Sequence, residues 1–248
     1  HPAARRAPAP DLRRASPPSA ADPVQERDAL RDAAAVLAIA LDAAAEQRLL
    51  GYLALLRKWN AVYNLTAIRD PQAMLVQHLF DCLAVVPALQ PYLHAGATVI
   101  DVGSGGGLPG VVLAVCAPQV QVHCVDTVGK KAAFVTQVRA ELDVSNLHAH
   151  HARVEQLQAP RDLPAAGVIV SRAFSSLDQF IALTRHLLAP GGVWAAMKGV
   201  LPQDELAMLP ADVRMRSAIT LAVPRLDAQR HLLLLASNVD SRPLAPTP

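Results

Sequence analysis

The hydrophobic residues of this chain follow one spacing before Gly96 and another after it. From residue 24 to about residue 90, apolar side chains recur three and four positions apart, as in Leu49, Leu53 and Leu56. That spacing predicts amphipathic helices. After Gly96, short β-branched runs alternate with longer amphipathic segments. This second pattern predicts an α/β fold, with a mostly parallel sheet covered by helices on both faces.

The predicted elements can be placed from the same pattern. Strands are expected at residues 98–102, 120–126, 146–152, 167–173 and 192–198, and helices near 109–117, 129–142 and 175–189. Two further strands, near 213–222 and 230–237, lie close enough in sequence to form a hairpin-like pair.

Composition divides the chain and bounds its class. A Pro-, Ala- and Arg-rich start offers no apolar periodicity that could offset the entropy of ordering. We therefore predict a disordered tail at 1–22, a helical N-terminal extension packed on the core at 23–95, one main domain at 96–240 and a flexible tail at 241–248. Hydrophobic residues make up 52% of the chain and charged residues 18%, which favours a soluble globular enzyme or binding domain.

Charge and cysteine usage add three expectations. The formal net charge is only +2, so a polyanionic partner would need a local basic surface. No apolar run looks long enough to cross a bilayer, so no membrane span is predicted. Cys82, Cys116 and Cys124 lie in aliphatic surroundings without a pairing motif, which indicates buried thiols in a reducing, cytoplasmic environment.

The stretch 101-DVGSGGGLPG-110 is the main candidate for a ligand site. Its glycines follow the first predicted strand, and open α/β sheets bind ligands at the carboxyl ends of their strands. Glycine allows a positive φ and a close approach of the main chain to a ligand. Pro109 would begin the next helix, where its missing N–H is not needed. The loop is thus predicted to cradle a bulky ligand.

Two ligand classes match this loop in different frames. Gly105, Gly107 and Gly110 fit the dinucleotide fingerprint, with Asp126 at the expected distance to accept ribose hydroxyls. That frame would make the protein an NAD-dependent oxidoreductase, although no proton-transfer residue is evident for one.

The other frame begins at Asp101, followed by Gly103, Gly105 and Gly107, and is similar to the class I methyltransferases. A carboxylate suits S-adenosylmethionine, which carries an ammonium and a sulfonium, better than it suits a pyrophosphate. Asp126 serves this frame equally well, because a carboxylate can accept two ribose hydroxyls. The electrostatics therefore favour methyl transfer.

Two other clusters have competing interpretations. Trp59 and Tyr63 are spaced as an i, i+4 core pair, but with Arg and Lys between them they also suit a nucleic-acid contact. Alternation places His148 and His150 on one strand face, yet no third ligand is evident, so no metal site is predicted.

Several separate stretches together resemble one family. The chain is similar to the RsmG family, also called GidB, of bacterial methyltransferases acting on guanine N(7) of 16S ribosomal RNA. The matching pieces are 59-WNAVYNLTAIRDP-71, His78 with Asp81, 101-DVGSGGGLPG-110, 126-DTVGKK-131, 153-RVE-155, 171-SRAF-174, 197-MKG-199 and 230-RHL-232. The combination of WN-x-x-YNLT with SRAF is the most specific part of the resemblance.

The resemblance implies a class I, Rossmann-like S-adenosylmethionine-dependent methyltransferase fold with an added helical layer. It implies 16S rRNA in the small ribosomal subunit as the partner, no metal, and cofactor contacts at Gly103, Leu108, Val154, Glu155 and Arg172. The loop departs from the family at Ser104 and Gly106, where Thr and Pro are frequent, and the second of these changes adds flexibility. We also expect a monomer.

The chemistry implied for such an enzyme needs no general base, because guanine N(7) already has a free lone pair. The expected contribution of the protein is alignment, desolvation and a donor to the neighbouring guanine oxygen. Arg172 is the hypothesised catalytic donor or a contact to the tail of the methyl donor, and Lys198 is a weaker second. Phosphate contacts are expected from Arg57, Lys58, Arg69, Lys130, Lys131, Arg139 and Arg153. A non-catalytic RNA-binding or ribosome-assembly module remains an alternative.

Overall fold

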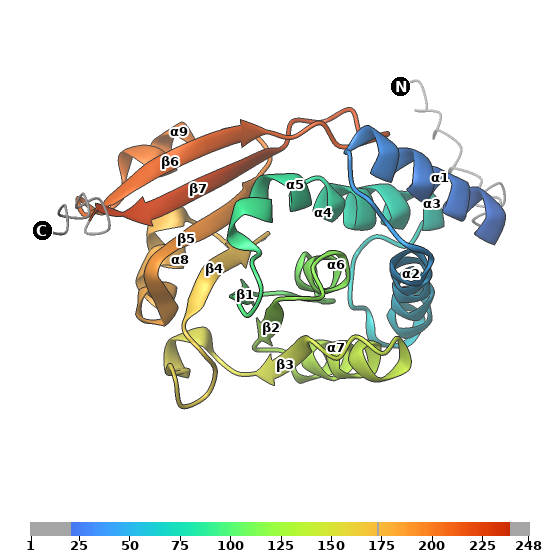
Figure 1. Ribbon diagram of the computed structural model, residues 1–248, viewed down its shortest axis with the longest axis horizontal. Coiled ribbons are helices and arrows are strands. Elements are labelled where there is room, and N and C mark those ends of the chain that lie inside the picture. The colour runs from blue at the N-terminus through green and yellow to red at the C-terminus, as the bar shows by residue number, and fades with distance from the viewer. Residues whose placement is uncertain (1–20, 173, 239–248) are drawn as a thin grey trace, which may run out of the picture.

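The computed structural model describes residues 21–172 and 174–238 (Figure 1). The tail predicted at 241–248 lies outside these residues. The tail predicted at 1–22 overlaps them only at its last two positions, where Asp22 already forms the N-cap of the first helix.

One seven-stranded sheet forms the centre of the molecule, in the order β3-β2-β1-β4-β5-β7-β6. Its strands are β1 (Thr98–Val102), β2 (Gln121–Asp126), β3 (Leu147–His151), β4 (Ala166–Ser171), β5 (Leu188–Lys198), β6 (Val213–Thr220) and β7 (His231–Ser237). The first five are parallel to one another, whereas β7 is antiparallel to both β5 and β6. The mostly parallel sheet and its terminal antiparallel pair are confirmed.

Helices cover the two faces of this sheet. On one face lie α6 (Gly110–Cys116) and α7 (Gly129–Glu141), and on the other lie α8 (Leu177–Thr184) and α9 (Gln203–Ala207). Short 3₁₀ turns follow β3 at η4 (Val154–Gln156) and α8 at η5 (Arg185–Leu187). The helix expected to reach residue 189 ends earlier, because β5 already begins at Leu188.

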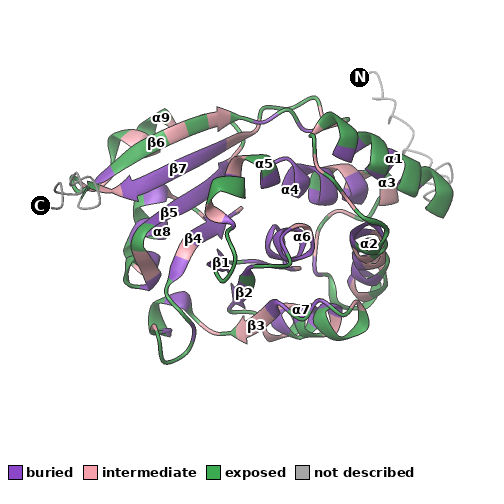
Figure 2. Ribbon diagram, in the orientation of Figure 1, coloured by how far each residue is buried: buried purple, intermediate pink, exposed green. Residues whose placement is uncertain are grey.

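Each face of the sheet has its own apolar core. Val99, Val122 and Val168 point into the core under α6 and α7, whereas Ile100 and Ile169 point into the core under α8. The alternation follows from the two-residue period of a strand. In Figure 2 the inner strands β5 and β7 are mostly purple and the edge strand β6 is mostly green. The edge strand β6 thus exposes most of its residues.

The N-terminal helices extend the layer formed by α6 and α7. They are α1 (Pro23–Val36), α2 (Ala43–Tyr63), α3 (Pro71–Met74), the π-helical η2 (Leu75–Phe80), α4 (Asp81–Leu83), α5 (Val86–Leu89) and the 3₁₀ turn η3 (Gln90–Tyr92). Asp22, Asp42 and Asp70 cap the first three of these helices by accepting amide hydrogen bonds. The apolar spacing continues through Leu41 and wrongly predicts helix there. In the structure α1 ends at Val36, and Ala38 has a φ of +55°.

The elements from α3 to η3 run on as one helical stretch, Pro71–Tyr92. By length and composition this stretch could span a membrane, because its most apolar window of 18 residues has a mean hydropathy of 1.4, so the expectation that no apolar segment is long enough was wrong. However, 67% of its most apolar window is buried inside the fold. Leu75, Leu79 and Leu83 belong to the same core as α6, which is typical of a core helix.

Candidate active site

The glycine-rich loop leaves the carboxyl end of β1 and leads into α6. Gly103, Gly105 and Gly107 have φ values of +66°, +57° and +89°, a region that favours glycine. A Cβ built on Gly103 or Gly105 would meet no described atom within 4 Å, so both positions face open space. A Cβ on Gly107 would lie 2.7 Å from Val111, so this glycine is needed for packing within the loop.

Asp101 lies beneath the loop and not in front of it. The side chain is fully buried, and its Oδ2 accepts a hydrogen bond of 2.7 Å from the amide of Gly110. Within the described structure Oδ1 has no partner. Burial raises the pKa of this carboxyl to about 7, although the bond from Gly110 opposes the shift. Asp101 therefore holds the loop against α6 and lines neither of the hollows described below.

The position of Asp101 also helps to decide between the dinucleotide frame and the methyltransferase frame of the glycine loop. In a dinucleotide site, the pyrophosphate bonds to the amides at the start of the helix after the loop. Here the Asp101 carboxyl already bonds to the Gly110 amide at the start of α6. The geometry disfavours the dinucleotide frame and the oxidoreductase that it would serve.

Asp126 closes β2 and fixes the other side of the loop. One of its oxygens accepts from the Gly105 amide and the other from the Val128 amide, each at 2.9 Å. Each carboxylate oxygen can accept a further hydrogen bond. Asp126 therefore orients the loop and still presents acceptors to the space beside it.

Two hollows of about 180 Å³ each meet at Gly103. The first lies over the ends of β1 and β2 and is lined by Asp126, Val154 and Glu155, among others. The second lies between the loop and α2, and its lining includes Gly105 and Leu108. The structure thus brings the predicted cofactor residues together in one two-part depression, with Asp101 and Gly107 supporting it from behind.

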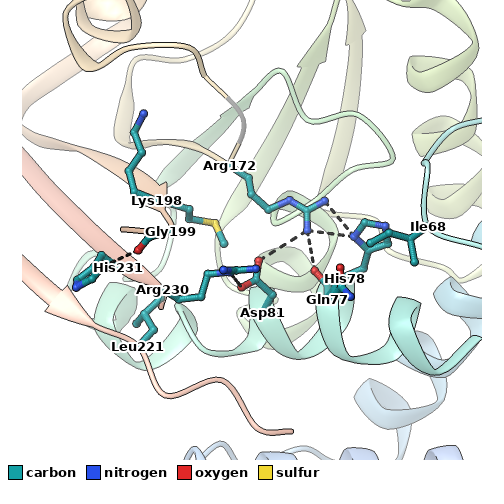
Figure 3. Close-up of a pocket in the computed structure, with 11 residues that line it drawn as sticks. Ile68, Gln77, His78, Asp81, Arg172, Lys198, Gly199, Leu221, Arg230 and His231 are labelled. Carbon is teal, nitrogen blue, oxygen red and sulfur yellow. Dashed lines mark hydrogen bonds and ion pairs between the residues drawn. The ribbon is translucent and has the colours of Figure 1, made fainter. Parts of the chain in front are cut away.

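Arg172 follows the end of β4 and points toward the irregular helix η2, as Figure 3 shows. Both of its terminal nitrogens lie 3.2 Å from Nδ1 of His78, and Nη1 also donates to the Gln77 carbonyl at 3.2 Å. Its side chain is 26% exposed. Arg172 lines the second hollow and also a third cavity, of about 300 Å³, on the far side of its guanidinium.

His78 is held in its neutral form. Burial, and secondarily the charge of Arg172, lower the pKa of its imidazole to about 4. Because Arg172 has only donors, Nδ1 of His78 must accept, so Nε2 carries the proton. Nε2 lies 2.8 Å from Oγ1 of Thr66, to which it donates.

Asp81 lies one helical turn beyond His78 and joins two arginines. Its Oδ1 accepts from Nε of Arg230 at 3.0 Å, and its Oδ2 lies 3.9 Å from Nη1 of Arg172. Arg230 comes just before β7, so residues from three distant parts of the chain meet at the third cavity.

Lys198, at the end of β5, does not join this cluster. Figure 3 shows its side chain pointing away from Arg172 and Asp81. Its Nζ is paired with Glu205 at 3.0 Å. Lys198 does line the third cavity, so its role as a second donor stays a prediction, although this ion pair already engages its ammonium group.

The basic residues expected to contact phosphate are divided by the structure. Arg57 is largely buried and forms an ion pair with Glu26, and Arg139 donates to the Leu147 carbonyl and contacts His148. Arg57 is thus engaged inside the fold, whereas Arg139 is exposed but already bonded to neighbouring groups. Others remain on the surface or line the second hollow, namely Lys58, Arg69, Lys130, Lys131 and Arg153.

The histidines of β3 have a neighbour that the sequence did not reveal. His123 on β2 stacks on His148 and His150, with ring centroids 4.6 and 5.1 Å apart. Among residues 21–172 and 174–238 there is nevertheless no group of His, Cys, Asp or Glu able to hold a metal ion. Register explains the contact, because β2 and β3 pair in parallel with His123 opposite His148.

Residues of the WN-x-x-YNLT stretch shape the site indirectly. Asn60 is buried and bonds to the Thr66 amide at 2.8 Å and to the Ile68 carbonyl at 3.3 Å. This fixes the segment after α2 against the cavities. Trp59 and Tyr63 do form the expected aromatic pair, with centroids 5.2 Å apart, but Tyr63 is 45% exposed. The WN-x-x-YNLT motif did not by itself predict these structural roles for Asn60 and Thr66.

The family described as rRNA small subunit methyltransferase G, GidB, matches residues 45–233. The chain belongs to this family. It is 53% identical to "Ribosomal RNA small subunit methyltransferase G" of Acidovorax ebreus (strain TPSY), over 84% of this chain and 93% of the relative. A protein of the same name from Burkholderia ambifaria is 55% identical, over 85% of this chain and 94% of the relative.

Solved structures agree with this family assignment at the level of the fold. A SAM-dependent methyltransferase from Aquifex aeolicus matches with a TM-score of 0.50 and 15% identity, covering 66% of this chain and 92% of that one. TrmN from Thermus thermophilus matches with a TM-score of 0.50 and 19% identity, covering 63% and 48%. The GidB family member described here therefore has the Rossmann-like fold of S-adenosylmethionine-dependent methyltransferases.

Proposed function

We propose that this protein transfers a methyl group from S-adenosylmethionine to N(7) of a guanine in 16S rRNA of the small ribosomal subunit. The observation that carries the proposal is the two-part hollow at the carboxyl ends of β1 and β2, which ends at Arg172. Membership of a family of rRNA small subunit methyltransferases supports the choice of RNA as the acceptor.

The residues around the glycine loop fit this cofactor. Gly103 and Gly105 leave open space where a side chain would otherwise stand. Asp126, Val154 and Glu155 line the part that suits a nucleoside. In this arrangement Gly103 would lie where the nucleoside joins the amino-acid part. When bound, the cofactor supplies a methyl group on a positively charged sulfur.

The amino-acid part of the cofactor would occupy the second hollow. Leu108 and Gly105 line it from the loop, and Tyr52 lines it from α2. Lys131 offers an ammonium group for a carboxylate at the same hollow. Asp101 acts through the loop in this proposal, by fixing Gly110 and thereby the course of the chain above it.

Methylation of guanine N(7) requires little acid–base chemistry from the protein. Guanine N(7) attacks through its own lone pair, so the protein has only to align it and exclude water. Arg172 is the proposed donor to the guanine oxygen next to N(7), a contact that would hold the base in line with the methyl group. His78 cannot serve as an acid near neutral pH, because its pKa is about 4.

The RNA would be held by local basic residues, since the net charge is small. Lys58 on α2 and Arg153 at the start of η4 are both exposed. Neutralising phosphates in this way makes binding weaken as salt increases. We propose a monomer acting on the small subunit in the cytoplasm.

The test is methyl transfer from labelled S-adenosylmethionine to small subunits taken from cells that lack this protein. The expected result is label at one guanine, mapped as N(7)-methylguanosine by the strand cleavage that this modification permits. An Arg172→Ala variant is expected to lose about 100-fold in kcat, because a misplacement of the reacting atoms by about 1 Å can cost that much.

Two other outcomes would reject the proposal. Retention of subunits without any label would indicate a non-catalytic RNA-binding module. Calorimetric binding of a nicotinamide dinucleotide in place of S-adenosylmethionine would indicate the oxidoreductase.

A further inference from the structure

The third cavity is set apart from the cofactor hollows by a single layer of side chains. It has a volume of about 300 Å³, at the lower end of the range for small-molecule sites. Arg172 and His78 belong both to its wall and to the wall of the second hollow. A group bound in this cavity therefore lies directly beside the part of the cofactor that carries the methyl group, if the proposed function holds.

The walls of the cavity suit a flat heterocycle. Ile68, Met197 and Leu221 supply apolar surface from three different segments. Polar side chains lie around this surface, with Asp81, Arg172 and Arg230 along one side in Figure 3. Apolar faces combined with polar groups at the edge are what a nucleobase requires of a binding site.

Asp81 holds the two arginines on the polar side of the cavity. Only 7% of its side chain is exposed, whereas Arg172 and Arg230 are 26% and 30% exposed. Burial raises the pKa of its carboxyl, and the two arginine charges oppose that shift. A buried carboxylate with two guanidinium partners is compensated, while the guanidinium groups themselves remain able to reach a ligand.

The helix that carries Asp81 is distorted at this position. The Asp81 amide bonds to the carbonyls of Val76 and His78 and passes over the carbonyl of Gln77. The Gln77 carbonyl accepts from Arg172 instead. π-helical turns of this kind are frequent at functional sites. The irregular turn thus adds a third acceptor, besides His78 and Asp81, that fixes the plane of the Arg172 guanidinium.

We propose that this cavity receives the target base, and that Asp81 is the positioning residue that aims Arg172 and Arg230 at O6 of the base. Arginine offers only donors. Guanine carries the acceptor O6 beside N7, whose lone pair attacks the methyl group, whereas adenine carries the N6 amino donors at that position. Two aimed guanidinium groups therefore select a six-oxo purine and reject a six-amino purine.

The first test separates positioning from binding of the cofactor. Asp81→Asn keeps the size of the side chain but removes the charge between the two arginines. We expect kcat for methyl transfer to small subunits to fall about tenfold or more, with S-adenosylmethionine affinity within about twofold of wild type by calorimetry. Arg230→Gln, at a more exposed position, should act in the same direction. The double variant should lose little more than Asp81→Asn alone, because the two residues act through one arrangement.

Asp212→Asn is the matched control. It makes the same change in the exposed pair of Asp212 with Arg185, which lines none of the three cavities, and kcat should stay at the wild-type value. In ¹⁵N spectra of the arginine side chains, Asp81→Asn should shift or broaden the Nε–H signals of Arg172 and Arg230. Asp212→Asn should affect the signal of Arg185 instead.

The second test concerns the base. In subunits reconstituted with the target guanine replaced, hypoxanthine, which keeps O6, should still be methylated, and adenine should not. Equal methylation of the adenine substrate would overturn the proposal. So would a kcat within twofold of wild type in Asp81→Asn, or a loss of S-adenosylmethionine affinity in proportion to the loss of kcat. If the wild type transfers no methyl group to guanine, the proposed function fails, and the arginine signals alone decide whether Asp81 holds the two side chains.

Discussion

Asp101 lies one residue before the end of β1 and Asp126 ends the neighbouring strand β2, and the two have different roles at the site. Asp101 is buried and holds the Gly110 amide, while Asp126 bonds to the Gly105 amide and also faces the cofactor hollow. Both were predicted to contact the ligand, because the sequence shows only that an acid lies at or near the end of each strand. Which carboxylate faces the ligand depends on side-chain direction, which alternates along a strand.

Gly103→Ala tests whether the loop is a cradle or only a turn. A Cβ at this position strains a backbone with φ of +66° and enters the space proposed for the cofactor. Calorimetry should show S-adenosylmethionine affinity reduced at least about tenfold, equivalent to about 1.4 kcal/mol. The strain itself should lower the free energy of unfolding by about 1 kcal/mol.

Gly96→Ala provides the control for that strain. Gly96 has a φ of +79°, and a Cβ there would likewise meet no described atom within 4 Å. It precedes β1 and so lies at the opposite end of that strand from Gly103. Its substitution should cost similar stability and leave cofactor affinity unchanged. A parallel loss of affinity in both variants would show that general strain, and not the cradle, is responsible.

Several functional residues could be predicted from the sequence and others could not. The glycine loop and Arg172 follow recognisable strand ends, so their neighbourhood was predicted. The Tyr52 hydroxyl acts through a contact made only when the helical layer folds onto the loop. Asn60 and Thr66 act through bonds within the helical layer, which the apolar spacing does not specify. His123 was missed as the third member of the histidine cluster because the register of β2 against β3 was unknown.

At the scale of elements, α2 is tied to the glycine loop by one buried hydrogen bond. The Tyr52 hydroxyl donates to the Gly106 carbonyl at 2.8 Å, and its ring lies 6.0 Å from that of Phe134 on α7. The N-terminal layer therefore forms one wall of the cofactor hollow and also restrains the flexible loop. The division of the chain into a helical extension and a main domain stays a prediction, but the two share one continuous core.

Tyr52→Phe should loosen this connection without changing the packing of the ring. The lost bond leaves the Gly106 carbonyl short of a partner, which should cost about 1 to 2 kcal/mol of unfolding free energy. Hydrogen exchange of the amides in 103–107 should become faster, and cofactor affinity should fall. Tyr63→Phe, on the same helix but 45% exposed, should do neither. Unchanged exchange in the Tyr52 variant would mean that the loop is held by Asp101 and Asp126 alone.

At the scale of the whole molecule, the sheet was the most predictable part. β-branched runs define the strands, and their alternation with helices requires parallel pairing. The order of the strands and the place of β7 between β5 and β6 depend on long-range pairing, for which the sequence offered only the expectation of a terminal pair. The break after α1 was missed, because apolar spacing continues through a segment that is not helical.

Buried titratable groups make the stability of the whole molecule depend on pH. Burial, followed by the charges of His148 and His150, lowers the pKa of His123 to about 4. A histidine with a lowered folded pKa contributes its full stability above an unfolded pKa of about 6.5, and this is lost as pH falls. Burial also lowers the pKa of His78 to about 4, whereas it raises that of Asp101 to about 7, which opposes the trend.

The comparison of wild type with His123→Gln isolates one of these contributions. Between pH 7.5 and pH 5, the wild type should lose about 2 kcal/mol more unfolding free energy than the variant. Urea unfolding at the two pH values measures the difference. Equal losses in both proteins would mean that His123 titrates normally in the fold, despite its neighbours.

The place of β7 has a consequence for how the protein is made. Arg230 reaches Asp81 only when β7 has been inserted between β5, which leaves the ribosome earlier, and the edge strand β6. A nascent chain can therefore shape the glycine loop and its hollows well before synthesis ends. The cavity beside Arg172 cannot be closed until nearly the last described residue has emerged.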